Sequence, residues 1–237
     1  MVSREGGAIN HWRNIVEGLP SLLKGLGINV EILLGLISLG FVVGIIIAIV
    51  QVYGKKCFVW PAVAYEWFFR GVPELVLILL VFFGLRQFGV KITAFFAATL
   101  ALGLRSSAYQ SQIFRGAIQA VGHGQMLAAL SLGMTRIQAI RYVILPQALR
   151  LAIPPWSNEF SSVLKDTTLA YAIGVEEILR RANYLRMRDY LITIPVFIIV
   201  ALLFLVLTYA GNWTLGRLER RFRIPGFEVK GAREERL

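Results

Sequence analysis

Three ionisable side chains, Arg70, Arg105 and Glu159, interrupt long apolar stretches of the chain. Each lies 12 to 14 residues from the charged or amide residue that flanks its stretch. In a helix with a rise of 1.5 Å per residue, these separations correspond to depths of about 18 to 21 Å. A charge at that depth in a membrane is costly and normally faces a cavity or another charge. We expect two cations and one anion to share a layer near the midplane.

Such a layer suits an amino acid, because an arginine fork can hold a carboxylate and a carboxylate can hold an ammonium group. Arg70, Arg105, Asn158 and Glu159 are therefore the candidate substrate-binding residues. An alternative is purely structural: Arg70 would pair with Glu66 or Glu74 one helical turn away, and Arg105 with Glu159. The residues themselves favour neither alternative.

The composition places these residues in a membrane protein. Of 237 residues, 57% are hydrophobic and 16% are charged, and the mean hydropathy is +0.65. That is more apolar material than one soluble domain of this length can bury. The net charge of +11 is interpreted as the basic bias of cytoplasmic loops, not as a nucleic-acid footprint. A single cysteine, Cys57, and two distant histidines, His11 and His123, indicate neither metal nor redox chemistry.

The expected fold class is an all-α polytopic membrane protein with about five transmembrane helices, each of about 20 residues. Residues 1–27 are expected on the outer side, with a surface helix over 12–26. Pro154 and Pro155 predict a broken fourth span. The arginines after the last span place the tail, 216–237, in the cytoplasm and the N-terminus outside. The expected spans within the membrane domain, 28–215, are 28–52, 57–88, 92–114, 146–164 and 190–213.

The loop over 116–146 is expected to form two short amphipathic helices. Leu127, Leu130 and Met134 recur at helical spacing in the first, and apolar residues recur likewise from Ile137 onward. Gly133 lies between the two as a turn or C-cap. The apolar stripe must be covered by the protein's own helices or by a partner.

This loop resembles the one that marks permease subunits of bacterial and archaeal ABC importers. The resemblance extends from about Leu19 to Arg221 and is closest to the polar-amino-acid branch, which includes the histidine and glutamine permeases. It rests on the motifs FRGVP from Phe69, IFRG from Ile113, SLGMTRIQAIRYVILPQA from Ser131, NEF from Asn158 and KDT from Lys165. The resemblance implies that the pair of short helices docks on an ATPase, through Gln125, Ala128, Ala129, Gly133, Arg136, Leu145 and Pro146.

The resemblance also implies the partners and the location. They are a cytoplasmic dimer of ATP-binding subunits, a second permease subunit that is a copy or a close homologue, an external solute-binding protein and an amino-acid substrate. The chain would lie in the plasma membrane of a prokaryote. It would hold no cofactor, because ATP and magnesium bind to the partner ATPase, and it would hydrolyse nothing itself.

Departures from the family pattern refine these expectations. Leu127 stands where the loop usually has Glu. Docking would then rest on shape, apolar contact and Arg136 or Arg141, or this chain would pair with a sister subunit that keeps the usual motif. Gln112 replaces a frequent Glu, and Arg105 a small or polar residue. Because these changes make the cavity more positive, they favour an acidic amino acid or its amide as substrate.

Two other classes of protein remain as alternatives. An ion-coupled secondary carrier could also use buried charges and broken helices, but such carriers usually contain two repeated halves, and no repeat is evident here. A membrane assembly subunit would use the buried charges only to pair helices. A membrane enzyme is disfavoured because the serine and threonine pairs have no histidine within the same spans.

Overall fold

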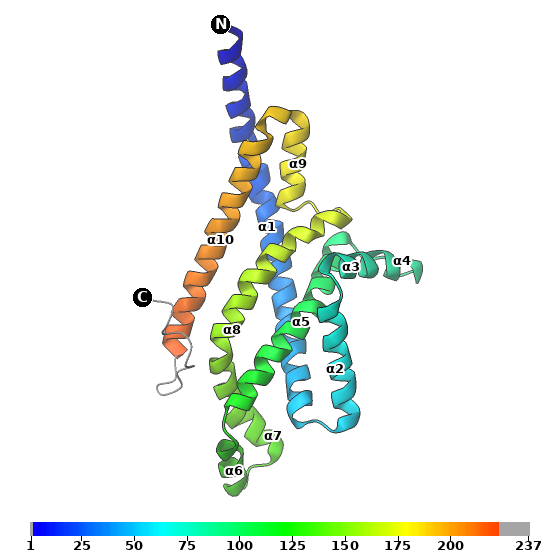
Figure 1. The fold of residues 1–237 in the computed structure, drawn as a ribbon, viewed down its shortest axis with the longest axis vertical. Coiled ribbons are helices and arrows are strands. Elements are labelled where there is room, and N and C mark those ends of the chain that lie inside the picture. The colour runs from blue at the N-terminus through cyan, green and yellow to red at the C-terminus, as the bar shows by residue number, and fades with distance from the viewer. Residues whose placement is uncertain (1, 223–237) are drawn as a thin grey trace.

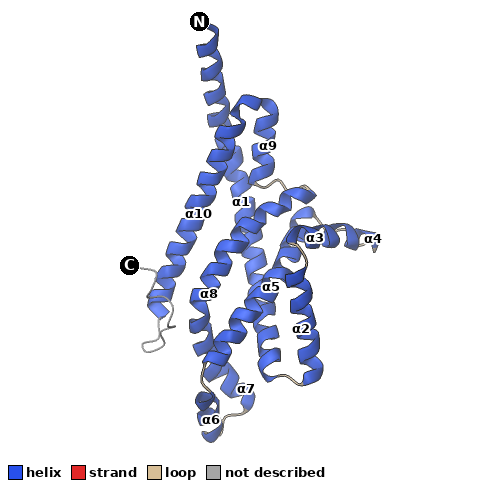
Figure 2. Ribbon diagram, in the orientation of Figure 1, coloured by secondary structure: helices blue, strands red, loops and turns tan. Residues whose placement is uncertain are grey.

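A computed structural model describes residues 2–222, with side chains from residue 11 onward. Every regular element in that range is a helix (Figure 2). Four long helices run roughly along the molecule, namely α1 (Val2–Tyr53), α5 (Ala94–Ala120), α8 (Leu145–Asp166) and α10 (Thr193–Phe222) (Figure 1). The expected all-helical architecture is therefore confirmed for these residues.

Helix α1 is continuous from Val2 to Tyr53. At 1.5 Å per residue it is about 78 Å long, more than twice the hydrocarbon thickness of about 30 Å. The expected surface helix over 12–26 is therefore not a separate element but the first half of α1. Its buried side chains Ile15 and Leu22 pack against α9 (Ile178–Arg188), which holds this half upright (Figure 1).

The expected second span, 57–88, is sharply bent. Helix α2 (Lys56–Gly71) ends before Pro73, and Val72 is extended with φ −92° and ψ 132°, as the residue before a proline prefers. The chain then turns by 107° into the segment Glu74–Gln87. That segment consists of α3 (Glu74–Leu79), a π-helical turn (Leu80–Gly84) and α4 (Leu85–Gln87), and it projects sideways in Figure 1.

The fourth expected span is, in contrast, unbroken. Helix α8 runs from Leu145 to Asp166 through Pro154 and Pro155 without interruption. The break predicted at this proline pair is therefore wrong, and the interruption occurs at Pro73 instead. Pro154 and Pro155 lack the backbone N–H groups that would donate to the carbonyls of Arg150 and Leu151, so α8 stays continuous in spite of two missing backbone hydrogen bonds.

Helices α1 and α5 pack closely because both present small residues. A Cβ atom on Gly40 would lie 2.3 Å from the Gln110 amide nitrogen, and one on Gly44 would lie 3.1 Å from the Ser107 carbonyl oxygen. The alanines of α5 between 94 and 103 that face the core are buried. These alanines form a close-packing face, which brings the polar residues of α5 against α1.

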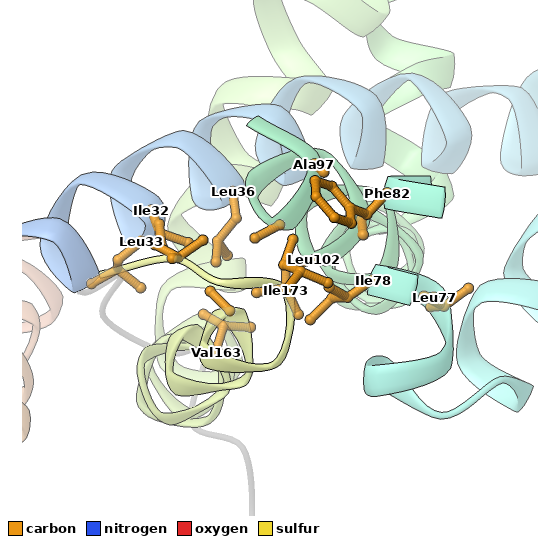
Figure 3. Close-up of a cluster of buried hydrophobic side chains, with 14 of the residues drawn as sticks. Ile32, Leu33, Leu36, Leu77, Ile78, Phe82, Ala97, Leu102, Val163 and Ile173 are labelled. Atoms are coloured by element: carbon orange, nitrogen blue, oxygen red, sulfur yellow. The ribbon is translucent and has the colours of Figure 1, made fainter. Parts of the chain in front are cut away.

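The largest apolar core joins α1, α3, α5 and α8 (Figure 3). Leu36 of α1, Ile78 of α3 and Leu164 of α8 are fully buried in it. The 3-10 helix Thr167–Ile173 closes this core with Ile173. This core sets the mutual position of the three segments that carry Glu74, Arg105 and Asp166.

The loop over 116–146 forms α6 (His123–Ser131) and α7 (Arg136–Ala139), followed by a π-helical turn (Ile140–Ile144). Gly133 between them has φ +81°, a backbone conformation that glycine adopts without strain. Thr135 and Gln138 form a reciprocal capping box at the start of α7. The expected pair of short helices with a glycine turn is therefore confirmed.

On length and composition, two helical segments can cross a membrane, His11–Tyr53 and Tyr190–Phe222, and the bent pair after Lys56 raises the number to three. The 3-10 turn Tyr190–Ile192 precedes α10. The count of five spans stays a prediction, because α5 and α8 carry polar side chains. The part of the predicted tail after residue 222 lies outside the described residues.

Candidate functional site

Two guanidinium groups and a tyrosine ring form the centre of the candidate site. The Cζ atoms of Arg70 and Arg105 lie 5.1 and 4.6 Å from the centroid of the Tyr109 ring. Arg70 comes from α2, while Arg105 and Tyr109 lie one helical turn apart on α5. Distances of this size allow cation–π attraction. The two arginines expected in one layer are therefore brought to one tyrosine, which sequence reasoning did not select.

Arg105 joins three elements through two ion pairs. Its guanidinium contacts Glu74 at the start of α3 and lies 3.4 Å from the Asp166 carboxylate at the end of α8. Arg105 is only 13% exposed and its partners 30% and 22%. The structural pairing expected between Arg105 and Glu159 is therefore wrong in its partner. We define the Tyr109 cluster as Arg70, Glu74, Arg105, Tyr109, Glu159 and Asp166.

Arg70 pairs with neither of its expected partners. Glu74 is four residues away in sequence, but the bend at Val72 and Pro73 places it on a different helix, so the helical i, i+4 geometry is lost. Glu66 instead faces α5. Among the ion pairs of the described residues none involves Arg70, whose side chain is exposed. Arg70 therefore presents a guanidinium that can accept an anionic ligand group.

Glu66 anchors a polar stripe on α5. It is 3% exposed and accepts hydrogen bonds from Ser111 and from the Gln112 amide. The Gln112 oxygen in turn accepts from Arg115 at 2.6 Å. A glutamate at position 112 could not donate to Glu66 and would repel it. This geometry is the physical reason for the glutamine.

Glu159 lies at the α5–α8 contact. Ser106 Oγ donates to its carboxylate at 3.3 Å, and Gln110, fully buried, donates to Ser106 at 3.1 Å. Trp156 Nε1, one turn before Glu159, donates to the Gln110 oxygen at 2.9 Å. The hydrogen bonds on Glu159 and Gln110 thus orient the α8 face toward Arg105. Asn158 is exposed, and among the residues described it makes no side-chain hydrogen bond.

The residues missed from the sequence are Glu74, Tyr109 and Asp166 of the Tyr109 cluster. Asp166 could have been noticed, since it lies seven residues, or two helical turns, after Glu159 and so on the same face of α8. Glu74 was considered only as a partner of Arg70. Within residues 2–222 no group of three His, Cys, Asp or Glu side chains has the arrangement of a metal site.

The second candidate surface is the end of the molecule formed by α6 and α7 (Figure 1). Leu127, Leu132 and Ile137 are 64%, 80% and 78% exposed. Of the predicted apolar stripe, Leu127, Leu130 and Ile137 are left uncovered by the chain itself, whereas Ile144 is 2% exposed. We call Leu127, Leu132 and Ile137 the loop patch.

The predicted coupling residues surround this patch in different ways. Gln125, Ala128 and Gly133 are exposed, whereas Ala129 is 3% exposed and serves packing. The Arg136 guanidinium stacks on Tyr53 of α1, 5.5 Å from the ring centroid. Arg136 therefore ties the loop to α1. Leu145 and Pro146 form the first turn of α8, where the loop ends.

The chain is similar in sequence to a family of transport proteins and to amino-acid permeases. Residues 40–224 match the family described as binding-protein-dependent transport system inner membrane component. The probable amino-acid permease protein YxeN of Bacillus subtilis is 36% identical over 217 residues, which cover 90% of this chain and 96% of that protein. The glutamine transport system permease protein GlnP of Escherichia coli is 32% identical over 216 residues, covering 90% and 98%.

Solved structures agree with this assignment. A crystal structure of an amino acid ABC transporter with histidines superposes with a TM-score of 0.78 at 36% identity, covering 87% of this chain and 96% of that one. The methionine transporter MetNI, in an inward-facing form, shares the fold at 16% identity with a TM-score of 0.66. The resemblance derived from the loop motifs is thereby confirmed. The chain belongs to the family of binding-protein-dependent transport system inner membrane components, the permease subunits of ABC importers.

Proposed function

We propose that this permease carries polar amino acids and that the Tyr109 cluster is the place where they bind during passage. The observation that carries the proposal is the exposed Arg70 facing Tyr109 beside three carboxylates, Glu74, Asp166 and Glu159. Arg70 can hold a substrate carboxylate as a planar fork. Glu159 can hold the ammonium group.

The charge balance of the cluster opposes an acidic substrate. That expectation rested on Arg105 as an added cation and on Gln112 as a lost anion, but Glu74 and Asp166 flank Arg105. With Arg70 and Arg105 against three carboxylates, the formal charge of the Tyr109 cluster is −1. We therefore propose a neutral or cationic amino acid, because a second carboxylate on the substrate would meet repulsion.

The test is ATP hydrolysis by the full transporter in lipid, titrated with glutamine, arginine and glutamate in the presence of the solute-binding protein. Glutamine or arginine should stimulate hydrolysis and glutamate should not. Glu159→Gln should raise the substrate concentration needed for half-stimulation by about tenfold or more, as expected for one lost charge-assisted contact. Glu31→Gln is the matched control, since Glu31 is exposed on α1.

Two results would count against this assignment. Stimulation by glutamate alone would show that the acidic preference first expected was right. An unchanged response in Glu159→Gln would move the binding place away from the Tyr109 cluster.

We also propose that the loop patch docks on the ATP-binding subunit. Family membership implies such a partner and a solute-binding protein, and the exposed Leu127, Leu132 and Ile137 support an apolar contact in which no glutamate is needed. The variants Leu132→Asp and Ile137→Asp should lower the amount of co-purified ATP-binding subunit about tenfold. Met187→Asp, 78% exposed on α9, is the control.

The membrane placement follows from the same proposal. If α6 and α7 meet a cytoplasmic ATPase, the arginines ending α10 lie on the cytoplasmic side, as the positive-inside rule expects. The N-terminal half of α1 and α9 then lie outside. The transporter would contain two permeases, either two copies of this chain or this chain with a sister subunit that keeps the usual glutamate of the loop.

A further inference from the structure

A cavity lies between α8 and α10 at the same end of the molecule as the loop patch. Its volume is about 390 Å³, within the range of about 300 to 1,000 Å³ typical of small-molecule sites. Phe41 of α1 and Phe114 of α5 line its base, with ring centroids 5.3 Å apart in an edge-to-face arrangement. We call it the α8–α10 cavity.

The wall of the α8–α10 cavity is apolar and its length fits one membrane leaflet. From Pro146 to Trp156, both of which line it, α8 rises by about 15 Å, half of the hydrocarbon thickness of about 30 Å. Leu218 and Phe222 of α10 line the other side and are 43% and 40% exposed. The cavity is therefore open to the outside of the single chain along α10.

Positive charge gathers at one end of this apolar wall. Arg150 is the only charged residue among those lining the cavity, and Arg217, Arg220 and Arg221 follow on the last turns of α10. Within residues 2–222, none of these four arginines takes part in an ion pair. Glu219 is the one acidic residue of the same turns.

The arginines of α10 follow the charge-free stretch of this helix. The guanidinium carbon of Arg217 lies 3.5 Å from the centroid of the Trp213 ring. Basic pockets between transmembrane helices bind anionic lipid headgroups.

We propose that the α8–α10 cavity is a site for an anionic phospholipid. One acyl chain fills the apolar cavity. The headgroup phosphate is held by Arg150 together with Arg221, which is next to Phe222 of the cavity wall. Charge complementarity distinguishes this occupant from a neutral lipid, because an arginine at the mouth of an apolar cavity gains a phosphate partner. The site is separate from the Tyr109 cluster and does not depend on which amino acid is carried.

The test uses the permease purified with its ATP-binding subunit in nanodiscs of phosphatidylcholine with a minor share of phosphatidylglycerol. Either lipid carries a photoreactive group in its acyl chain. Cross-linked phosphatidylglycerol should map to peptides that contain Leu149–Trp156 and Leu215–Phe222. Arg150→Gln should lower this yield about fivefold, the factor expected for one arginine contact to an anionic headgroup.

Arg220→Gln is the matched control, because it removes the same charge from the far side of α10. Arg220 lies two positions from both Leu218 and Phe222, a rotation of about 200°. A second variant, Leu218→Trp, fills the cavity without changing charge and should also lower the yield, whereas Leu205→Trp on the exposed face of α10 should not.

Several outcomes would overturn the proposal. Equal labelling by phosphatidylcholine and phosphatidylglycerol, or equal losses in Arg150→Gln and Arg220→Gln, would reduce the site to ordinary lipid contact. If Leu218→Cys formed a disulfide with a second permease subunit in a background where Cys57 is replaced by serine, a neighbouring subunit would occupy the cavity. Increased labelling after removal of residues 223–237 would mean that the chain's own tail fills it.

Discussion

The ion pairs of Arg105 allow a quantitative test of how the Tyr109 cluster is held together. We consider Arg105→Gln, Glu74→Gln, Asp166→Asn and the two double variants that contain Arg105→Gln. Two charges 3.4 Å apart, as Arg105 and Asp166 are, attract by about 5 kcal/mol at an effective dielectric constant of about 20, before the desolvation cost. After that cost, coupling energies of about 1 to 3 kcal/mol are expected for contacting groups.

The same chain contains an exposed reference pair. Arg13 and Glu17, 2.8 Å apart on α1, are 76% and 61% exposed, whereas Arg105 is 13% exposed. An exposed i, i+4 pair contributes about 0.3 to 0.5 kcal/mol. We therefore expect the coupling of Arg105 with either carboxylate to exceed that of Arg13 with Glu17 at least twofold.

The assay is the free energy of unfolding in mixed micelles, measured for each single and double variant. Glu74→Gln and Asp166→Asn remain informative even if Arg105→Gln does not fold, because each leaves Arg105 with one partner. Coupling energies near 0.5 kcal/mol for both pairs would refute the reasoning. They would mean that water screens the Tyr109 cluster as fully as it screens the surface of α1.

Three further predictions concern helix packing, the loop and a buried carboxyl group, all outside the Tyr109 cluster. Gly44→Val should destabilise the permease by about 1 to 3 kcal/mol, since a Cβ atom on Gly44 would already lie 3.1 Å from backbone atoms of α5. The control is the unfolding of Gly27→Val, because a Cβ atom on Gly27 would lie in open space. Gly133→Ala should lower the free energy of unfolding by about 1 kcal/mol, because φ of Gly133 is +81°, and it should weaken recovery of the ATP-binding subunit. Gly116→Ala should do neither, because a Cβ atom on Gly116 would have no other atom within contact distance. Burial raises the pKa of the Glu177 carboxyl above its ordinary value of 4.5. The contribution of this carboxyl to stability is therefore present below about pH 4.5 and is lost as the pH rises through the folded-state pKa. Glu177→Gln should remove this pH dependence from a series of melting temperatures, and an unchanged dependence would contradict the assignment.

The class of protein and the main helices follow from the composition and the local residue pattern. Apolar stretches of about 20 residues predict helices, because a backbone in lipid must satisfy its own hydrogen bonds. The helix pair at 123–139 was predictable from local rules, since apolar spacing and Gly133 both act within one or two turns. The family also followed from these local motifs.

Which charges form ion pairs depends on how the helices pack in the folded chain. Arg105 and Asp166 are 61 residues apart, and their contact depends on the core that sets α5 against α8. Glu74 is close to Arg70 in sequence, but the chain turns by 107° at Pro73, so Glu74 forms an ion pair with Arg105 instead. Helical spacing could not reveal this, because it holds only while the helix continues.

The course of α1 illustrates the same limit. Residues 12–26 have the composition of a surface helix, yet they continue the axis of α1. The reason is that Leu22 packs against Ile178 and its neighbours on α9, more than 150 residues later. Periodicity states which face of a helix is apolar, but not what covers it. The covering partner is a long-range contact, and long-range contacts are set by the packing of the whole chain.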